Sequence, residues 1–190
     1  MGQIKTPNPV KLIVSALAPG EGLLAAAREA AVAEWGEIDV ESELLPFDHT
    51  TYYEREFGPH LVRRIWAFVT LVDPGTLPAI KVRSNEIEAR WAVDGKRQVN
   101  LDPGYLSAAK LVLATTKNHG HRIYLGQGIY AEVTLQYRRP TCRVGRQPTV
   151  GSGGKAIRPW PWTYPDYGSA RYCALFEGIR QRYMEQLRER

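Results

Sequence analysis

Cysteine is scarce in this sequence. The 190 residues include two cysteines, Cys142 and Cys173, which lie far apart. Disulfide-stapled proteins and zinc modules carry several cysteines at short, regular spacings. The sequence therefore predicts neither a disulfide framework nor a four-cysteine zinc site, and it favours two reduced thiols in a cytoplasmic protein.

Long hydrophobic runs are also missing. The chain has no stretch of about 18 consecutive apolar residues, the length needed to cross a bilayer as a helix. The apolar run near the N-terminus is short and has polar, proline-containing flanks, unlike a signal peptide. We therefore expect a cytoplasmic location and no membrane partner.

The composition suits a folded domain with an anionic partner. Hydrophobic residues make up 44% of the chain and charged residues 24%, so a sizeable core is available and global disorder is not expected. At this length we expect one domain over 1–190. The net charge of +5 favours an anionic partner without identifying one.

Hydrophobic periodicity predicts an α+β fold with a mainly antiparallel sheet. The first half alternates strands and helices in the order βαββαβ, which is the ferredoxin-like arrangement. The expected elements are strands over 11–18, 38–47, 63–72 and 97–101, and helices over 23–35 and 77–92.

The second half is expected to extend this unit. Asp102 and Pro103 resemble a helix start, since Asp is a favoured N-cap and Pro suits the first helical position. We therefore expect a helix over 105–117, then a β-hairpin around Gly126-Gln127-Gly128. A C-terminal helix is expected from residue 171.

One segment stands out by its charge. Residues 138–158 contain six arginines or lysines and no acidic residue, together with several glycines and prolines. This composition predicts a mobile basic loop within the domain.

Several motifs occur together in one order along the chain. They are PVKLIVSAL, DGKR, NLDPGYLSAAKLVLATTK, HRIYLGQGIYAEVTL and PWTYPDY. Through them the chain resembles the bacterial and archaeal proteins of domain-of-unknown-function family 4416. The resemblance covers nearly the whole chain and departs at 140–158, where a much shorter connection is expected. It implies a small cytoplasmic prokaryotic domain and brings no activity or catalytic residues.

Polar residues gather just before the helix expected over 105–117. Lys96 and Arg97 lie at the entrance of the preceding strand, and Asn100 lies within it. A helix N-terminus binds anions, so these residues are candidate ligands of a phosphate group. The alternative is a capped helix after a charged turn.

Further cations are expected on that helix. Lys110 and Lys117 are seven residues apart, two helical turns, and would share one face; Arg122 follows. Lysine as a point charge and arginine as a bidentate donor would together hold a phosphate chain. The alternative is a solvated helix face.

Acid–base candidates come from two segments. Asp48 and Glu56 lie in a polar, aromatic segment, and Glu132 lies in an expected strand, with His121 as a candidate proton carrier. Such groups serve acid–base catalysis or bind a divalent metal such as Mg²⁺. Loop packing and a solvent-facing strand are the alternatives, and no metal is specified.

The aromatic segment PWPWTYPDY offers Trp162 and Tyr164 as ring-stacking residues. With the basic loop they could bind bases and phosphates of RNA. The alternative is a rigid strap whose rings fill gaps between the sheet and the last helix.

Three functions follow from these candidates. The leading hypothesis is an enzyme or binding domain for a phosphate-bearing small molecule, such as a nucleotide. The second is a non-catalytic RNA-binding module that uses the basic loop and the aromatic segment. The third is an interaction scaffold without a ligand.

Overall fold

The computed structural model describes residues 2–47, 57–58, 61–138 and 156–189, and it has an α+β fold. In chain order its elements are β1 (Val10–Ala18), α1 (Glu21–Trp35), β2 (Ile38–Glu41), β3 (Leu45–Pro46), β4 (Val62–Val72), a 3₁₀ turn (Pro74–Thr76), α3 (Leu77–Ala89), β5 (Asn100–Leu106), β6 (Lys110–Thr115), β7 (Ile123–Gly126), β8 (Ile129–Arg138), β9 (Ala156–Pro159) and α4 (Ala170–Arg188).

The strands form one antiparallel sheet in the order β2-β4-β1-β5-β6-β8-β7, with β3 beside β4 and β9 beside β8. The βαββαβ unit expected from the sequence consists of β1, α1, β2, β4, α3 and β5, with the short strand β3 between β2 and β4. The predicted ferredoxin-like start and the mainly antiparallel sheet are confirmed.

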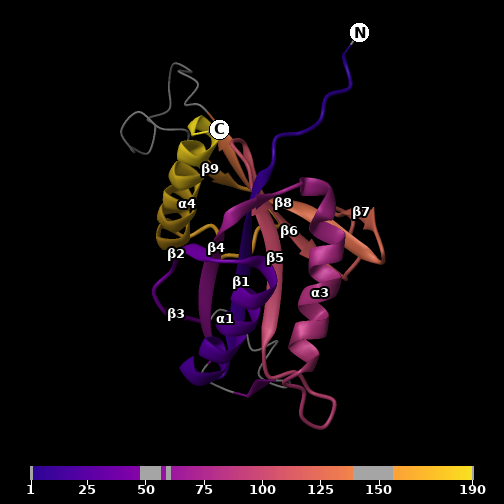
Figure 1. Ribbon diagram of the computed structural model, residues 1–190, viewed down its shortest axis with the longest axis vertical. Coiled ribbons are helices and arrows are strands. Elements are labelled where there is room, and N and C mark those ends of the chain that lie inside the picture. The colour runs from indigo at the N-terminus through magenta and orange to yellow at the C-terminus, as the bar shows by residue number, and fades with distance from the viewer. Residues whose placement is uncertain (1, 48–56, 59–60, 139–155, 190) are drawn as a thin grey trace.

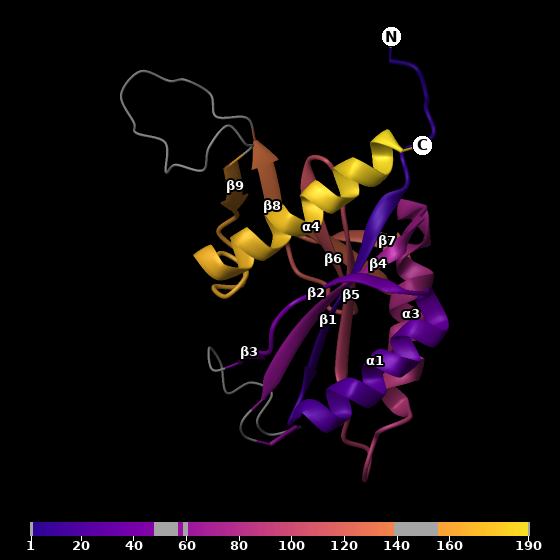
Figure 2. The ribbon, with the colours of Figure 1, turned by 60° about the vertical axis from the view of Figure 1, so that its left-hand side comes forward.

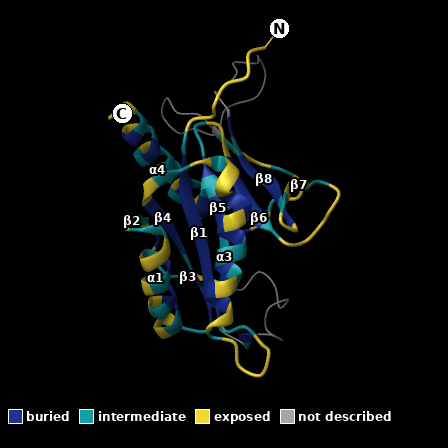
Figure 3. Ribbon diagram, turned by 45° about the vertical axis from the view of Figure 1, so that its right-hand side comes forward, coloured by how far each residue is buried: buried dark blue, intermediate teal, exposed yellow. Residues whose placement is uncertain are grey.

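Helices cover both faces of the sheet (Figure 1, Figure 2). On one face, Leu12 and Val14 of β1 join a core cluster with residues of α1 and α3. On the other face, Ile13 joins a cluster with Phe176 and Ile179 of α4. Successive residues of β1 therefore pack into different layers, and Figure 3 shows this strand buried along its length.

The helix expected over 105–117 is wrong. These residues belong to β5 and β6, which pair Gly104 with Leu113 and Leu106 with Leu111. Leu111 packs toward α4, whereas Val112 packs toward α3. A strand covered on both faces is apolar at consecutive positions, and such a short run has the same appearance as a buried helix.

The prediction of a helix start at Asp102 and Pro103 is also wrong, because both residues lie within strand β5. They pair with Ser15 and Val14 of β1, while the pairing of β5 with β6 begins only at Gly104. Proline cannot donate to a neighbouring strand, so it fits where one side of β5 has no partner among the described strands. β6 continues past Leu113 to Thr115, but these last residues do not pair with β5. The two strands therefore diverge beyond the pair of Gly104 and Leu113.

Three other predictions can be compared with the structure. The hairpin is confirmed as β7 and β8, and the C-terminal helix is confirmed as α4. The loop expected over 138–158 is wrong at its ends, since Arg138 ends β8 and pairs with Ala156 of β9. Residues 139–155 lie outside the described residues.

In the part of the chain that the structure describes, α4 is the longest helix, with 19 residues, but it carries many charged side chains. No helix there is both long enough and apolar enough to cross a bilayer.

Candidate functional site

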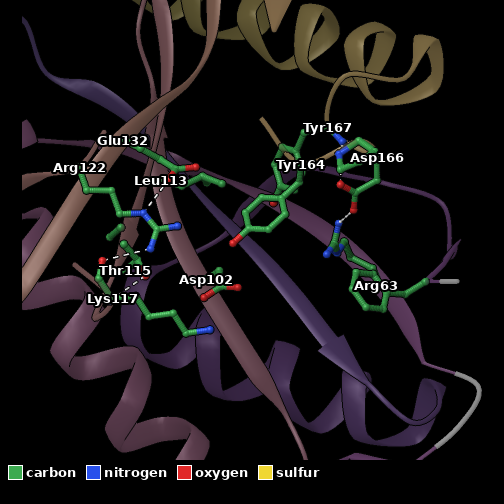
Figure 4. A pocket seen from close by; sticks show the side chains of 13 residues that line it. Arg63, Asp102, Leu113, Thr115, Lys117, Arg122, Glu132, Tyr164, Asp166 and Tyr167 are labelled. Carbon is green, nitrogen blue, oxygen red and sulfur yellow. Dashed lines mark hydrogen bonds and ion pairs between the residues drawn. The ribbon is translucent and has the colours of Figure 1, made fainter. Parts of the chain in front are cut away.

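A cavity of about 370 Å³ opens where β5 and β6 diverge, under the segment that leads into α4 (Figure 4). Its wall combines charged side chains with aromatic rings. Among the described residues, the lining consists of Phe47, Arg63, Asp102, Leu113, Ala114, Thr115, Lys117, Arg122, Glu132, Tyr164, Pro165, Asp166 and Tyr167.

The aromatic segment, residues 160–168, crosses the sheet as a strap. Trp162 Nε1 donates to the Val133 carbonyl oxygen at 3.2 Å, and Thr163 Oγ1 donates to that of Thr134 at 2.6 Å. Both acceptors belong to β8 between the stretches that pair with β7 and β9. The strap thus covers an open edge of β8 and brings Tyr164 to the cavity.

Arg63 of β4 anchors the far end of the strap. Its Nη1 donates to the Asp166 carboxylate and, at 3.2 Å, to the Tyr172 hydroxyl. The guanidinium lies 4.5 Å from the centre of the Phe47 ring and 5.4 Å from that of Tyr167. Burial opposes its charge, but Tyr167 and Asp166 outweigh burial and raise the pKa of Arg63. Arg63 is therefore a permanent, rigidly held cation.

Glu132 of β8 lies in the opposite wall of the cavity. Its buried carboxylate accepts from Arg122 Nε at 2.8 Å and lies 2.9 Å from His121 Nε2. Arg122 also donates from Nη1 to the Lys117 carbonyl oxygen at 3.1 Å. The Glu132 side chain, expected to face either solvent or a cleft, therefore faces the cavity.

Asp102 projects from the unpaired side of β5. Its carboxylate accepts from Lys81 Nζ at 3.1 Å and from Asn100 Nδ2 at 2.7 Å. Burial would raise the pKa of Asp102, but Lys81, Asn100 and Arg63 together hold it below its usual range. Asp102 is therefore a carboxylate at neutral pH.

Behind Asp102 lies a network of buried charges between α3 and β5. Glu88 accepts from Arg97 Nη1 at 2.9 Å and from the Leu101 amide at 2.7 Å. Burial raises the pKa of Glu88, against the effect of nearby Lys81. This network supports Asp102 from the face of the sheet opposite to the strap.

A column of four aromatic rings stands beside the cavity. Trp160 stacks on Trp162 with ring centroids 5.1 Å apart, and Trp162 stacks on His121 at 5.2 Å. His121 stacks in turn on His119 at 6.1 Å, and His119 is exposed. We call these residues the ring column; His121 links it to Glu132.

The structure brings several sequence-predicted site residues together. Glu132, Lys117, Arg122 and Tyr164 line the cavity. His121 and Trp162 lie next to it, through the Glu132 contact and the strap.

Other predicted residues lie elsewhere. Lys110 and Lys117 do not share a helix face. Lys110 is the first residue of strand β6, and Lys117 lies two residues after its last residue, Thr115. Lys96 is exposed in a turn, while Arg97 and Asn100 belong to the network behind Asp102.

The predicted acid–base pair Asp48 and Glu56 lies outside the described residues. Within the ranges that the structure does describe, no three His, Cys, Asp or Glu side chains are grouped so as to hold a metal ion.

Sequence reasoning missed three residues of the site. Asp102 was interpreted as a helix cap, and nothing in the pattern of β4 distinguishes Arg63 from a surface arginine. Asp166 lies 103 positions after Arg63, so no local spacing connects them. The one available signal was the proline after Asp102, which is unusual within a sheet and marks the unpaired side of β5.

Comparison with known proteins yields one family. A family model described as "Domain of unknown function (DUF4416)" matches residues 8–145, which include β1 to β8. No curated protein and no solved structure matches the chain. Tyr164 and Asp166 of the strap lie beyond the matched region.

Proposed function

The chain belongs to the DUF4416 family, whose description names no activity, and from its cavity we propose that it binds a phosphate-bearing small molecule between β5, β6 and the strap. The cavity volume of about 370 Å³ lies within the usual range of small-molecule sites, roughly 300–1,000 Å³.

The observation that carries this proposal is the convergence of Arg122, Lys117 and Tyr164 on one cavity. Arg122 donates from Nε and Nη1 to protein groups, and among the described residues its Nη2 has no partner. Figure 4 shows the Arg122 guanidinium and the Tyr164 ring extending into the same space. A guanidinium nitrogen, an ammonium group and a phenol are suitable donors for a phosphate group.

The carboxylates of the lining do not oppose an anion, since each is compensated by its own cation. Asp166 pairs with Arg63, Glu132 with Arg122, and Asp102 with Lys81. Because the pair of Glu132 with Arg122 is buried, it also holds the Arg122 guanidinium in place before a ligand arrives.

Thermal-shift measurements with inorganic phosphate, sugar phosphates and nucleotides test the proposal. A ligand that binds only the native state raises the melting temperature, and 100 Kd of ligand adds about 2.7 kcal/mol. We expect the shift to be lost in Lys117→Ala and kept in Lys110→Ala, a matched exposed lysine near the other end of β6. No shift with any of these compounds, in protein that is correctly folded, would refute the proposal.

The ring column supports a second candidate, an RNA-binding surface. Stacked rings bind unpaired bases regardless of sequence, and phosphate contacts make such binding strongly salt-dependent. The exposed ring of His119 ends the column and leaves a face for a base. Anisotropy of a labelled single-stranded RNA at two salt concentrations tests this candidate: His119→Ala should weaken binding of RNA without changing binding of phosphate.

A further inference from the structure

Resting on the proposed function, we infer that the ligand is a sugar phosphate with free vicinal hydroxyls, and that Asp102 accepts hydrogen bonds from these hydroxyls. Arg122 and Lys117 would hold the phosphate on the β6 side of the same cavity.

Asp102 is the carboxylate that the cavity exposes. Its side chain is 38% exposed, whereas those of Glu132 and Asp166 are 3% and 4% exposed. This difference follows from the sheet, because no strand of the described ranges pairs with β5 on one side at Asp102. A ligand that enters the cavity therefore meets the Asp102 oxygens more readily than those of Glu132 and Asp166, which are almost fully buried and each bonded to an arginine through one oxygen.

The carboxylate is ionised and already held in place. Lys81 is buried and donates both to Asp102 Oδ1 and to the Leu101 carbonyl oxygen, the latter at 2.9 Å. Asn100 donates to Oδ2, so each oxygen has one protein donor in the described structure. An ionised carboxylate offers about four acceptor positions, which leaves positions for two further donors.

Hydroxyls fit these positions better than an ammonium group. The charge of Asp102 is compensated by Lys81 at 3.1 Å, so a second cation would gain less attraction and would lose its hydration. Neutral hydroxyls satisfy the remaining lone pairs without that cost. A carboxylate performs the same task on ribose in dinucleotide-binding folds. Adjacent hydroxyls together with a phosphate define a sugar phosphate.

Isothermal titration calorimetry with inorganic phosphate, ribose 5-phosphate and 2-deoxyribose 5-phosphate tests the inference. Hydrogen bonds to a charged acceptor are strong, so we expect ribose 5-phosphate to bind the wild-type protein about tenfold or more tightly than the other two. In Asp102→Asn this advantage should fall to about threefold or less. The ratio of affinities is the readout, because loss of the carboxylate charge leaves Lys81 less compensated and strengthens the binding of all three anions.

The outcomes separate this inference from the proposed function. Equal affinities for all three compounds, or an advantage that persists in Asp102→Asn, would overturn the role of Asp102 and leave phosphate binding intact. Absence of binding by all three compounds would overturn both. If Asp102→Asn fails to fold, the comparison of ribose 5-phosphate with 2-deoxyribose 5-phosphate in the wild-type protein still tests the preference for vicinal hydroxyls, and equal affinities there would overturn the inference.

Discussion

Single residues with buried charges do two different tasks in this protein. Lys11, Arg63 and Glu88 are buried and bonded to protein groups, so they connect elements of the fold. Asp102 is also engaged but remains partly exposed to the cavity. Among the carboxylates that line the cavity, exposure therefore separates the candidate ligand-binding group, Asp102, from Glu132 and Asp166.

The burial of Lys11 predicts that the stability of the protein depends on pH. Burial lowers the pKa of this lysine, and its ion pair with Asp39 at 2.8 Å only partly compensates. Between this lowered pKa and about 10.4, the ordinary value, the unfolded chain binds more protons than the folded one. The free energy of unfolding should therefore rise with pH in that window.

Replacement of this lysine by methionine tests the effect. Lys11→Met should lose the Lys11 contribution to the slope, as measured by urea unfolding at several pH values from 7.5 to about 10. The variant itself should be less stable, because Phe68 and Gln186 lose a donor. Equal pH slopes in the two proteins would contradict the prediction.

Gly104 predicts a steric limit at the point where β5 meets β6. A Cβ atom at this position would collide with the Val112 carbonyl oxygen and the Leu113 side chain. Gly104→Ala should therefore destabilise the protein by about 1–3 kcal/mol or more, as measured by urea unfolding. Gly120→Ala is the control, since a Cβ there meets no atom within 4 Å; similar losses in both variants would refute the steric explanation.

At the scale of elements, the strap depends on β8 for its position. Thr163 Oγ1 accepts from the Trp160 amide at 2.8 Å and donates to the Thr134 carbonyl oxygen. These two bonds close a turn of the strap directly before Tyr164. The position of Tyr164 in the cavity is therefore set by backbone groups of β8 and by Asp166 beyond it.

Removal of the Thr163 hydroxyl should loosen the strap. Thr163→Val should cost about 1–3 kcal/mol of stability in urea unfolding, because a buried carbonyl loses its donor. It should also weaken binding of a phosphate ligand, since Tyr164 is less well placed. Thr70→Val changes an exposed strand residue and should alter neither property; equal effects in the two variants would show that the strap contacts are not responsible.

At the scale of the whole molecule, most of the basic loop, residues 139–155, can be replaced without changing the described wall of the cavity. Arg138 and Ala156 are register partners at the ends of β8 and β9. A two-residue Asn-Gly turn in place of 139–155 would therefore join these strands as a hairpin. The shortened chain should keep the fold and the phosphate-induced thermal shift, because the cavity wall is already formed by residues of the described ranges.

The same variant distinguishes the two candidate functions. If RNA binding occurs and depends on the basic segment, its affinity and its salt dependence should fall in the shortened chain. Loss of the phosphate-induced thermal shift instead, with circular dichroism unchanged, would mean that the replaced segment takes part in the small-molecule site.

The sequence by itself determined most of the regular secondary structure of this protein. The βαββαβ order, the final hairpin and helix α4 all follow from periodicity and turn residues, which act over a few positions. Several cavity residues, among them Glu132, Arg122 and Tyr164, were identified from their side-chain chemistry. The order of motifs also indicated the family, which the family model then matched.

Only the tertiary structure decided between helix and strand at 102–117 and brought the site together. β6 is covered by α3 and α4 on its two faces, so its apolar run has no period that distinguishes it from a helix. Arg63 and Asp166 meet only because the strap returns across the sheet. Asp102 is exposed only because β5 and β6 diverge there, and neither event leaves a spacing that can be measured along the chain.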